Sequence, residues 1–150
     1  MLPVDPGFWS KKFKRGAVKY EIVLAIHEPK CVLINGPFRG GFHDLEMTRD
    51  KLKEKMNAAP GKLAISDRGY RSSKPDEEFL STPNELDPSI LHNFKSRARL
   101  RQETFNGRLK KYGSLQQTFR HGMEKHKFVL EAVCVIVQYQ MDNGSKLFAV

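Results

Sequence analysis

Residues 89–112 constrain the fold of this chain more than any other stretch, because their pattern predicts a long helix with one apolar face. At 100° per residue, six apolar side chains fall within about 40° of one line. They are Leu91, Phe94, Ala98, Phe105, Leu109 and Tyr112. Pro88 and Ser89 supply a start signal, and Gly113 supplies a stop. Any compact fold of this chain has to cover that apolar stripe with a second layer.

A second helix is predicted over residues 125–142, and it is apolar nearly all round. A helix of that kind is normally buried on most of its sides, so we expect residues 125–142 at the centre of the domain. Asn143 and Gly144 end it. Its apolar residues are Phe128, Val129, Leu130, Val133, Val135, Ile136, Val137, Tyr139 and Met141.

The first third of the chain favours strands. Residues 19–26 are mostly apolar and rich in β-branched side chains, and residues 31–35 have the same character. The turn-forming segment 27–30 lies between them, so the two runs predict a β-hairpin.

The middle of the chain predicts shorter elements. Residues 43–56 form a modest amphipathic pattern, which indicates a helix. Residues 62–66 and 78–82 read as short strands, with a polar loop over 71–77 between them. Strands that alternate with helices in this order predict an α/β or α+β layer fold, in which helices cover a small mixed sheet.

Length and composition exclude several classes of protein. The chain has 150 residues, the size of one domain, and 39% of them are hydrophobic. The longest apolar run, residues 132–137, is far shorter than the ~20 residues that span a bilayer. The first residues have no apolar stretch typical of a secretory signal, so we expect an intracellular protein, nuclear or cytoplasmic. Cys31 and Cys134 each lie in an apolar run, which favours buried free thiols.

Charge points to a polyanionic partner. Lys and Arg total 26 against 17 Asp and Glu, which gives a formal net charge of +9. The predicted helix 89–112 concentrates this excess, with Glu103 the one acid among seven basic residues, which is unusual for a merely solubilising face. The net charge suits either nucleic acid or an anionic surface, and from this helix we predict DNA contacts by its basic residues. They are Lys95, Arg97, Arg99, Arg101, Arg108, Lys110 and Lys111.

Three acidic residues stand at positions that suit metal chemistry. Asp67 follows a short strand, where open sheets present ligand sites, and Glu103 lies on the long helix away from its apolar stripe. Asp44 opens the predicted helix 43–56. Carboxylates that converge from a strand end and a helix can hold Mg²⁺. The alternative is that Asp67 is a turn residue and Glu103 part of a solvated ion-pair face.

A series of short motifs in a fixed order resembles the DDE superfamily endonucleases derived from PIF/Harbinger-type transposases. No single motif is specific, but their order and spacing are, and they extend over nearly the whole chain. They are YEIV (20–23), NGP (35–37), GGFHD (40–44), SDRGY (66–70), TP (82–83), RQETFNGRLK (101–110), FRH (119–121) and DNG (142–144).

The resemblance implies an RNase H-like fold and metal-dependent cutting and joining of DNA. It implies that Asp67 and Glu103 are catalytic, and that they hold Mg²⁺ or Mn²⁺ together with Asp44. Water and then a DNA 3′-hydroxyl would attack a phosphodiester, with the ions stabilising both oxygens. The resemblance also allows for a separate DNA-binding helper protein as a partner.

In one respect the chain departs from the family. The first catalytic Asp normally lies on the central strand of the sheet, upstream of the segment that resembles residues 6–14 here. We therefore expect residues 1–16 to be an irregular segment and residues 17–150 to be a partial nuclease domain that lacks its first strand and is inactive alone. Two alternatives stay open: a non-catalytic nucleic-acid-binding module, and a transposon relic that folds poorly.

Overall fold

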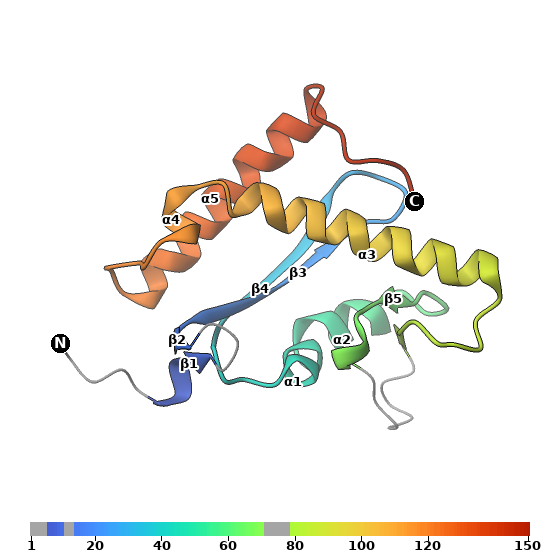
Figure 1. Ribbon diagram of the computed structural model, residues 1–150, viewed down its shortest axis with the longest axis horizontal. Helices are drawn as coiled ribbons and strands as arrows, with labels where there is room; N and C mark the ends of the chain where they lie inside the picture. Colours follow the sequence, from blue (N-terminus) through green and yellow to red (C-terminus); the bar gives the residue numbers. More distant parts are fainter. Residues whose placement is uncertain (1–5, 11–13, 71–78) are drawn as a thin grey trace.

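Helix α3 (Ser89–Leu109) crosses the whole molecule and contacts both of its halves (Figure 1). The computed structural model describes residues 6–10, 14–70 and 79–150. In this part of the chain, helices pack on three separate two-stranded sheets. The fold is therefore mixed α/β, as the order of predicted elements indicated.

The predicted hairpin is confirmed. Strands β3 (Val18–Leu24) and β4 (Cys31–Arg39) pair antiparallel, with Ile22 opposite Ile34. Strand β4 runs past the predicted end at residue 35 because Gly36 allows the two strands to stay close. At Gly36 the φ angle is +124°, and a Cβ there would lie 2.9 Å from the carbonyl oxygen of Lys19.

The two short strands in the middle of the chain are also present. Strand β5 (Ala64–Ile65) pairs parallel with β6 (Leu80–Ser81), and the 3₁₀ turn η2 (Arg68–Tyr70) follows β5. Most of the predicted loop 71–77, and residue 78 of the predicted strand 78–82, lie outside the described residues.

The single helix predicted over residues 43–56 is wrong in one respect: the structure has two. Helix α1 (Asp44–Thr48) is separated from α2 (Lys51–Asn57) by a break at Asp50, where φ is −86° and ψ is −110°. On one straight helix, Met47 and Leu52 would point about 140° apart. The break lets both side chains be buried.

The core lies where α3 and α5 (Met123–Asp142) meet the β3–β4 hairpin, with the short helix α4 (Gly113–Gln116) between the two long helices. Phe105 and Val137 are fully buried there. Of the predicted stripe, Ala98, Phe105 and Leu109 are buried, whereas Leu91 is 40% exposed. Cys134 belongs to this core and Cys31 packs against it, and both are free thiols as predicted.

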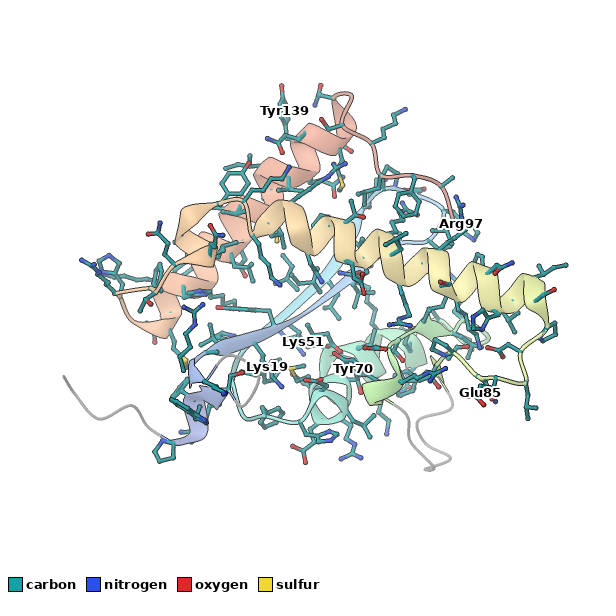
Figure 2. The ribbon with its side chains drawn as sticks, viewed as in Figure 1. Lys19, Lys51, Tyr70, Glu85, Arg97 and Tyr139 are labelled. Atoms are coloured by element: carbon teal, nitrogen blue, oxygen red, sulfur yellow. The ribbon has the colours of Figure 1, made fainter. Side chains whose placement is uncertain are left out.

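The expectation that residues 125–142 are buried on most sides is wrong. Helix α5 buries one face, which includes Leu130, Val133 and Val137, while Val135 and Tyr139 on the other face are each 68% exposed. Figure 2 shows Tyr139 directed away from the rest of the protein. The hairpin and α3 cover only one side of α5, so the remaining apolar side chains face solvent.

The described part of residues 1–16 has some regular structure. It contains the 3₁₀ turn η1 (Pro6–Phe8) and the strands β1 (Trp9–Ser10) and β2 (Arg15–Gly16), which pair antiparallel. No helix among the described residues is long and apolar enough to cross a membrane.

Two phenylalanines test this division into core and surface. We expect Phe105→Ala to lower the free energy of unfolding by about 3–5 kcal/mol, because it opens a cavity in the core. Phe128→Ala is the matched control, since the Phe128 side chain is 68% exposed on α5. Urea unfolding followed by circular dichroism measures both variants. Equal losses in the two variants would contradict the packing described here.

Candidate functional site

Asp67 and Glu103, which have 35 residues between them in the sequence, line the same cavity. The cavity has a volume of about 980 Å³ and lies between β3, β5 and α3. Asp67 enters it from the end of β5, and Glu103 enters it from α3. The fold therefore places on one cavity the two acids that the sequence singled out as candidate catalytic residues.

Arg99 forms an ion pair with the first of these acids, Asp67. Its Nη2 lies 3.0 Å from Oδ1 of Asp67, which also accepts a hydrogen bond from the backbone N–H of Arg68. Arg99 precedes Glu103 by four residues on α3, so the two side chains are neighbours on one helix face. Asp67 is therefore tied to α3 at Arg99, on the helix face that also carries Glu103.

Asp44, the third candidate metal ligand, lies near Tyr70. Burial is the main cause that raises the pKa of Tyr70, and the negative charges of Asp44, Glu21 and Asp67 raise it further, in that order. These three carboxylates therefore lie near Tyr70, which Figure 2 shows beside helices α1 and α2. Asp44 itself forms an ion pair with Lys19, whose Nζ is 2.9 Å from its Oδ1.

Two carboxylates on the cavity are of the type that a hard divalent cation prefers. Asp67 and Glu103 offer carboxylate oxygens, and Mg²⁺ is commonly held by one or two carboxylates plus waters. The described residues contain no group of three or more His, Cys, Asp or Glu side chains that could hold a metal. Among the described residues, the structure therefore offers the carboxylates of Asp67 and Glu103 on one cavity, and it does not gather them with Asp44 into a three-ligand group.

Glu21 is a residue of the cavity that the sequence analysis did not single out. It is 6% exposed, and its Oε1 is buried with no hydrogen-bond partner. Its other carboxylate oxygen accepts from Asn35 at 3.4 Å. Burial raises the pKa of Glu21 above the usual value of a glutamate. An acid inside the otherwise apolar run 20–26 was the signal that could have identified it.

Five of the seven candidate DNA-binding residues bond to the chain itself, and one of them is Arg99 in its ion pair with Asp67. Lys95 is buried, and its Nζ lies 3.0 Å from Asp87. Arg101 is also buried, and it donates to the carbonyls of Ile26 and Glu28. The other two hold the carboxyl-terminal segment: Arg97 donates to Ala149, and Arg108 donates to Ser145 and Lys146.

The remaining cations of this set are the exposed residues Lys110 and Lys111. Two more exposed cations, Arg120 and Lys125, lie in and after the connection from α4 to α5. Phe119 in that connection packs against α5, with its ring centroid 4.8 Å from that of His126. The end of α3, helix α4 and the start of α5 lie at one end of the molecule (Figure 1). We call Lys110, Lys111, Arg120 and Lys125 the basic end.

Comparison with known proteins adds no assignment. The chain matches no family model, no curated protein and no solved structure. The case for any function therefore depends on the residues and on their arrangement.

We expect Glu21→Gln to stabilise the protein at pH 7. A carboxyl group whose pKa is raised by folding favours the folded state below its unfolded pKa, and this benefit is lost as the pH rises through the folded pKa. The neutral amide avoids the burial of a charge, so the gain at pH 7 should be at least about 1 kcal/mol.

The gain from Glu21→Gln should shrink toward pH 4, where Glu21 itself becomes protonated. Thermal melts at both pH values measure it. Glu124→Gln is the control, because Glu124 is exposed on α5. A loss of stability at pH 7 in Glu21→Gln alone would contradict the buried, unpartnered carboxylate.

Proposed function

We propose that this chain is part of a DDE-type nuclease domain with an RNase H-like fold, and that it binds a divalent metal ion and DNA. In the complete family domain such a site cuts phosphodiester bonds. The observation that carries the proposal is the convergence of Asp67 and Glu103 on one cavity from distant parts of the chain. The motifs that resemble this family contain both residues.

The ion pairs that Asp67 and Asp44 form with basic side chains would not prevent these carboxylates from binding a metal ion. The side chain of Asp67 is 60% exposed in its pair with Arg99, and that of Asp44 is 43% exposed in its pair with Lys19. Exposed pairs contribute only about 0–1 kcal/mol, so a divalent cation can replace Arg99 at Asp67 with little loss. A bound Mg²⁺ or Mn²⁺ would supply the positive charge that activates a nucleophile and stabilises a leaving oxygen.

The positions of the other elements agree with this proposal. The structure contains both antiparallel and parallel strand pairs: β3 and β4 are antiparallel, and β5 and β6 are parallel. Long helices pack on these strands. The basic end provides exposed Lys and Arg side chains within one region. Such side chains bind the phosphate backbone and release its counterions. Glu124 is the one acid next to this group in the sequence, so the region keeps a positive balance.

We expect Mn²⁺ to raise the melting temperature of the protein. Metal at ten times its Kd stabilises the folded state by about 1.4 kcal/mol. For a chain of this length the gain corresponds to about 3–5 °C in Tm. Glu103→Gln and Asp67→Asn should each abolish the shift, because each removes one of the two donors. Differential scanning fluorimetry with and without Mn²⁺ measures it.

The matched control for the metal experiment is Glu85→Gln, because Glu85 is exposed and does not line the cavity. This variant should keep the full shift. Absence of a shift in the unaltered protein, or an equal shift in Glu103→Gln, would refute the metal site.

A second candidate function is metal-independent nucleic-acid binding. The observation that favours it is that Asp67 and Asp44 already have cationic partners, while the basic end is exposed. In this case the acids stabilise the fold, and only the basic end binds. The same DNA titration with and without Mg²⁺ separates the two functions.

We expect Lys110→Ala with Lys111→Ala to weaken binding to duplex DNA. Loss of two phosphate contacts should reduce the slope of log Kobs against log salt by about 1.8. Fluorescence anisotropy at several salt concentrations measures it. The control is Lys51→Ala with Lys30→Ala, which removes the same charge from exposed residues that lie outside the basic end and do not line the cavity (Figure 2 labels Lys51). Equal losses from both pairs would show that only net charge matters.

A further inference from the structure

Cys31 and Cys134 are far apart in the sequence, but the fold packs them together in the core. Cys31 is the first residue of β4, and Cys134 lies on the buried face of α5. Cys31 pairs across the hairpin with Leu24, and both of these side chains pack against the buried cluster that contains Cys134. The function proposed above uses neither thiol.

Gln138 fixes the start of β4 onto α5. Its Oε1 accepts a hydrogen bond of 3.0 Å from the backbone N–H of Cys31, and its Nε2 donates one of 2.8 Å to the carbonyl of Pro29. Cys134 precedes Gln138 by four residues, so the two side chains are neighbours on one face of the helix. The face of α5 that holds the Cys31 backbone therefore also carries the Cys134 thiol.

The two thiols interact directly. The Cys134 thiol is a hydrogen-bond partner of the Cys31 sulfur, whose Sγ also lies 3.8 Å from the carbonyl oxygen of Leu33. A disulfide requires its two sulfurs to approach to about 2.0 Å. Sulfurs that already share a hydrogen bond can make that approach by rotation of the side chains, without a rearrangement of β4 or α5.

The surroundings give the two thiols different reactivity. Cys134 is 3% exposed, whereas Cys31 is partly exposed. The hydrogen bond from Cys134 lowers the pKa of Cys31, while the same bond and burial raise the pKa of Cys134. The thiolate is the form of cysteine that reacts with oxidants, so Cys31 is the reactive member. An accessible thiolate beside a second thiol is typical of redox-sensing cysteines.

We propose that Cys31 and Cys134 form a peroxide-responsive pair that closes into a disulfide between β4 and α5. The oxidant belongs to the hydroperoxides, which include hydrogen peroxide itself. Cys31 is the residue that the peroxide oxidises, and Cys134 is the residue that completes the bond. The disulfide would join the hairpin to α5 covalently across the contact that forms the core.

The reaction has two steps and consumes one molecule of hydrogen peroxide. The Cys31 thiolate first attacks one peroxide oxygen, the O–O bond breaks, and the hydroxide that leaves takes up a proton to become water. Cys31 is then a sulfenic acid. The Cys134 thiol attacks the sulfenic sulfur, the S–S bond forms, and the S–O bond breaks, so that the hydroxyl group leaves as water with the proton of Cys134. Two thiols lose two electrons in total, and the peroxide is reduced to two waters.

The experiment treats the reduced whole chain with hydrogen peroxide and measures its intact mass. The disulfide removes two hydrogens, so the mass should fall by about 2 Da, and dithiothreitol should restore it. Proteolysis without reductant should yield the peptides of Cys31 and Cys134 joined to each other. The bond closes a long loop, so the oxidised chain should also show a rise in Tm of roughly 5 °C or more.

Two variants assign the roles of the thiols through dimedone, which reacts with sulfenic acids. In Cys134→Ala the sulfenic acid at Cys31 has no thiol to capture it, so dimedone labelling should rise at least about tenfold over the unaltered protein. Cys31→Ala is the matched control, because it leaves only the buried thiol, and it should show neither labelling nor a change in mass. Circular dichroism checks that both variants fold.

Four outcomes would overturn the proposal. An unchanged mass in the unaltered protein would show that the cysteines only fill the core. A disulfide that joins two copies of the chain would show that the two thiols do not meet within one molecule. Equal dimedone labelling of the unaltered protein and Cys134→Ala would show that Cys134 captures nothing, and an oxidised chain with no rise in Tm would show that the bond does not fit the native packing. The first two results come from the unaltered protein, and none of the measurements uses metal or DNA, so the test is independent of the proposed function.

Discussion

The packing of α3 against α5 and the β3–β4 hairpin is the interaction on which the rest of the structure depends. Phe105 of α3 and Val137 of α5 are fully buried at this contact. Arg101, one helical turn before Phe105, holds α3 to the turn of the hairpin through the carbonyls of Ile26 and Glu28. These bonds fix the rotation of α3. Arg99 and Glu103 line the cavity from α3, and Arg99 pairs there with Asp67.

The local sequence pattern, meaning β-branched runs, turn residues and helical periodicity, predicted the hairpin, the two short strands and both long helices, because local pattern and tertiary packing agree there. It failed for α5, where an apolar sequence on every side did not bring burial on every side. Val135 and Tyr139 stay exposed because only one layer covers the helix. It also failed at Asp50, where the burial of Met47 and Leu52 breaks the predicted helix.

The sequence identified residues of the candidate site, but it did not identify the contacts that these residues make. The motifs named Asp67 and Glu103, and the fold places both on one cavity. The sequence could not show that Arg99 pairs with Asp67, or that Lys95 is buried against Asp87. Both are tertiary contacts between segments far apart in the chain or across a turn. Counting basic residues along a helix does not separate cations that bind the chain from cations that face solvent.

The most direct test of the account is paramagnetic broadening of backbone amide signals by Mn²⁺ in NMR spectra of the whole chain. If Asp67 and Glu103 share one ion, small amounts of Mn²⁺ will broaden the amides around residues 66–69 and 99–106 together. The amides at the start and end of α5 will keep their intensity. Broadening near only one of the two acids, or strongest broadening elsewhere in the chain, would contradict a shared site.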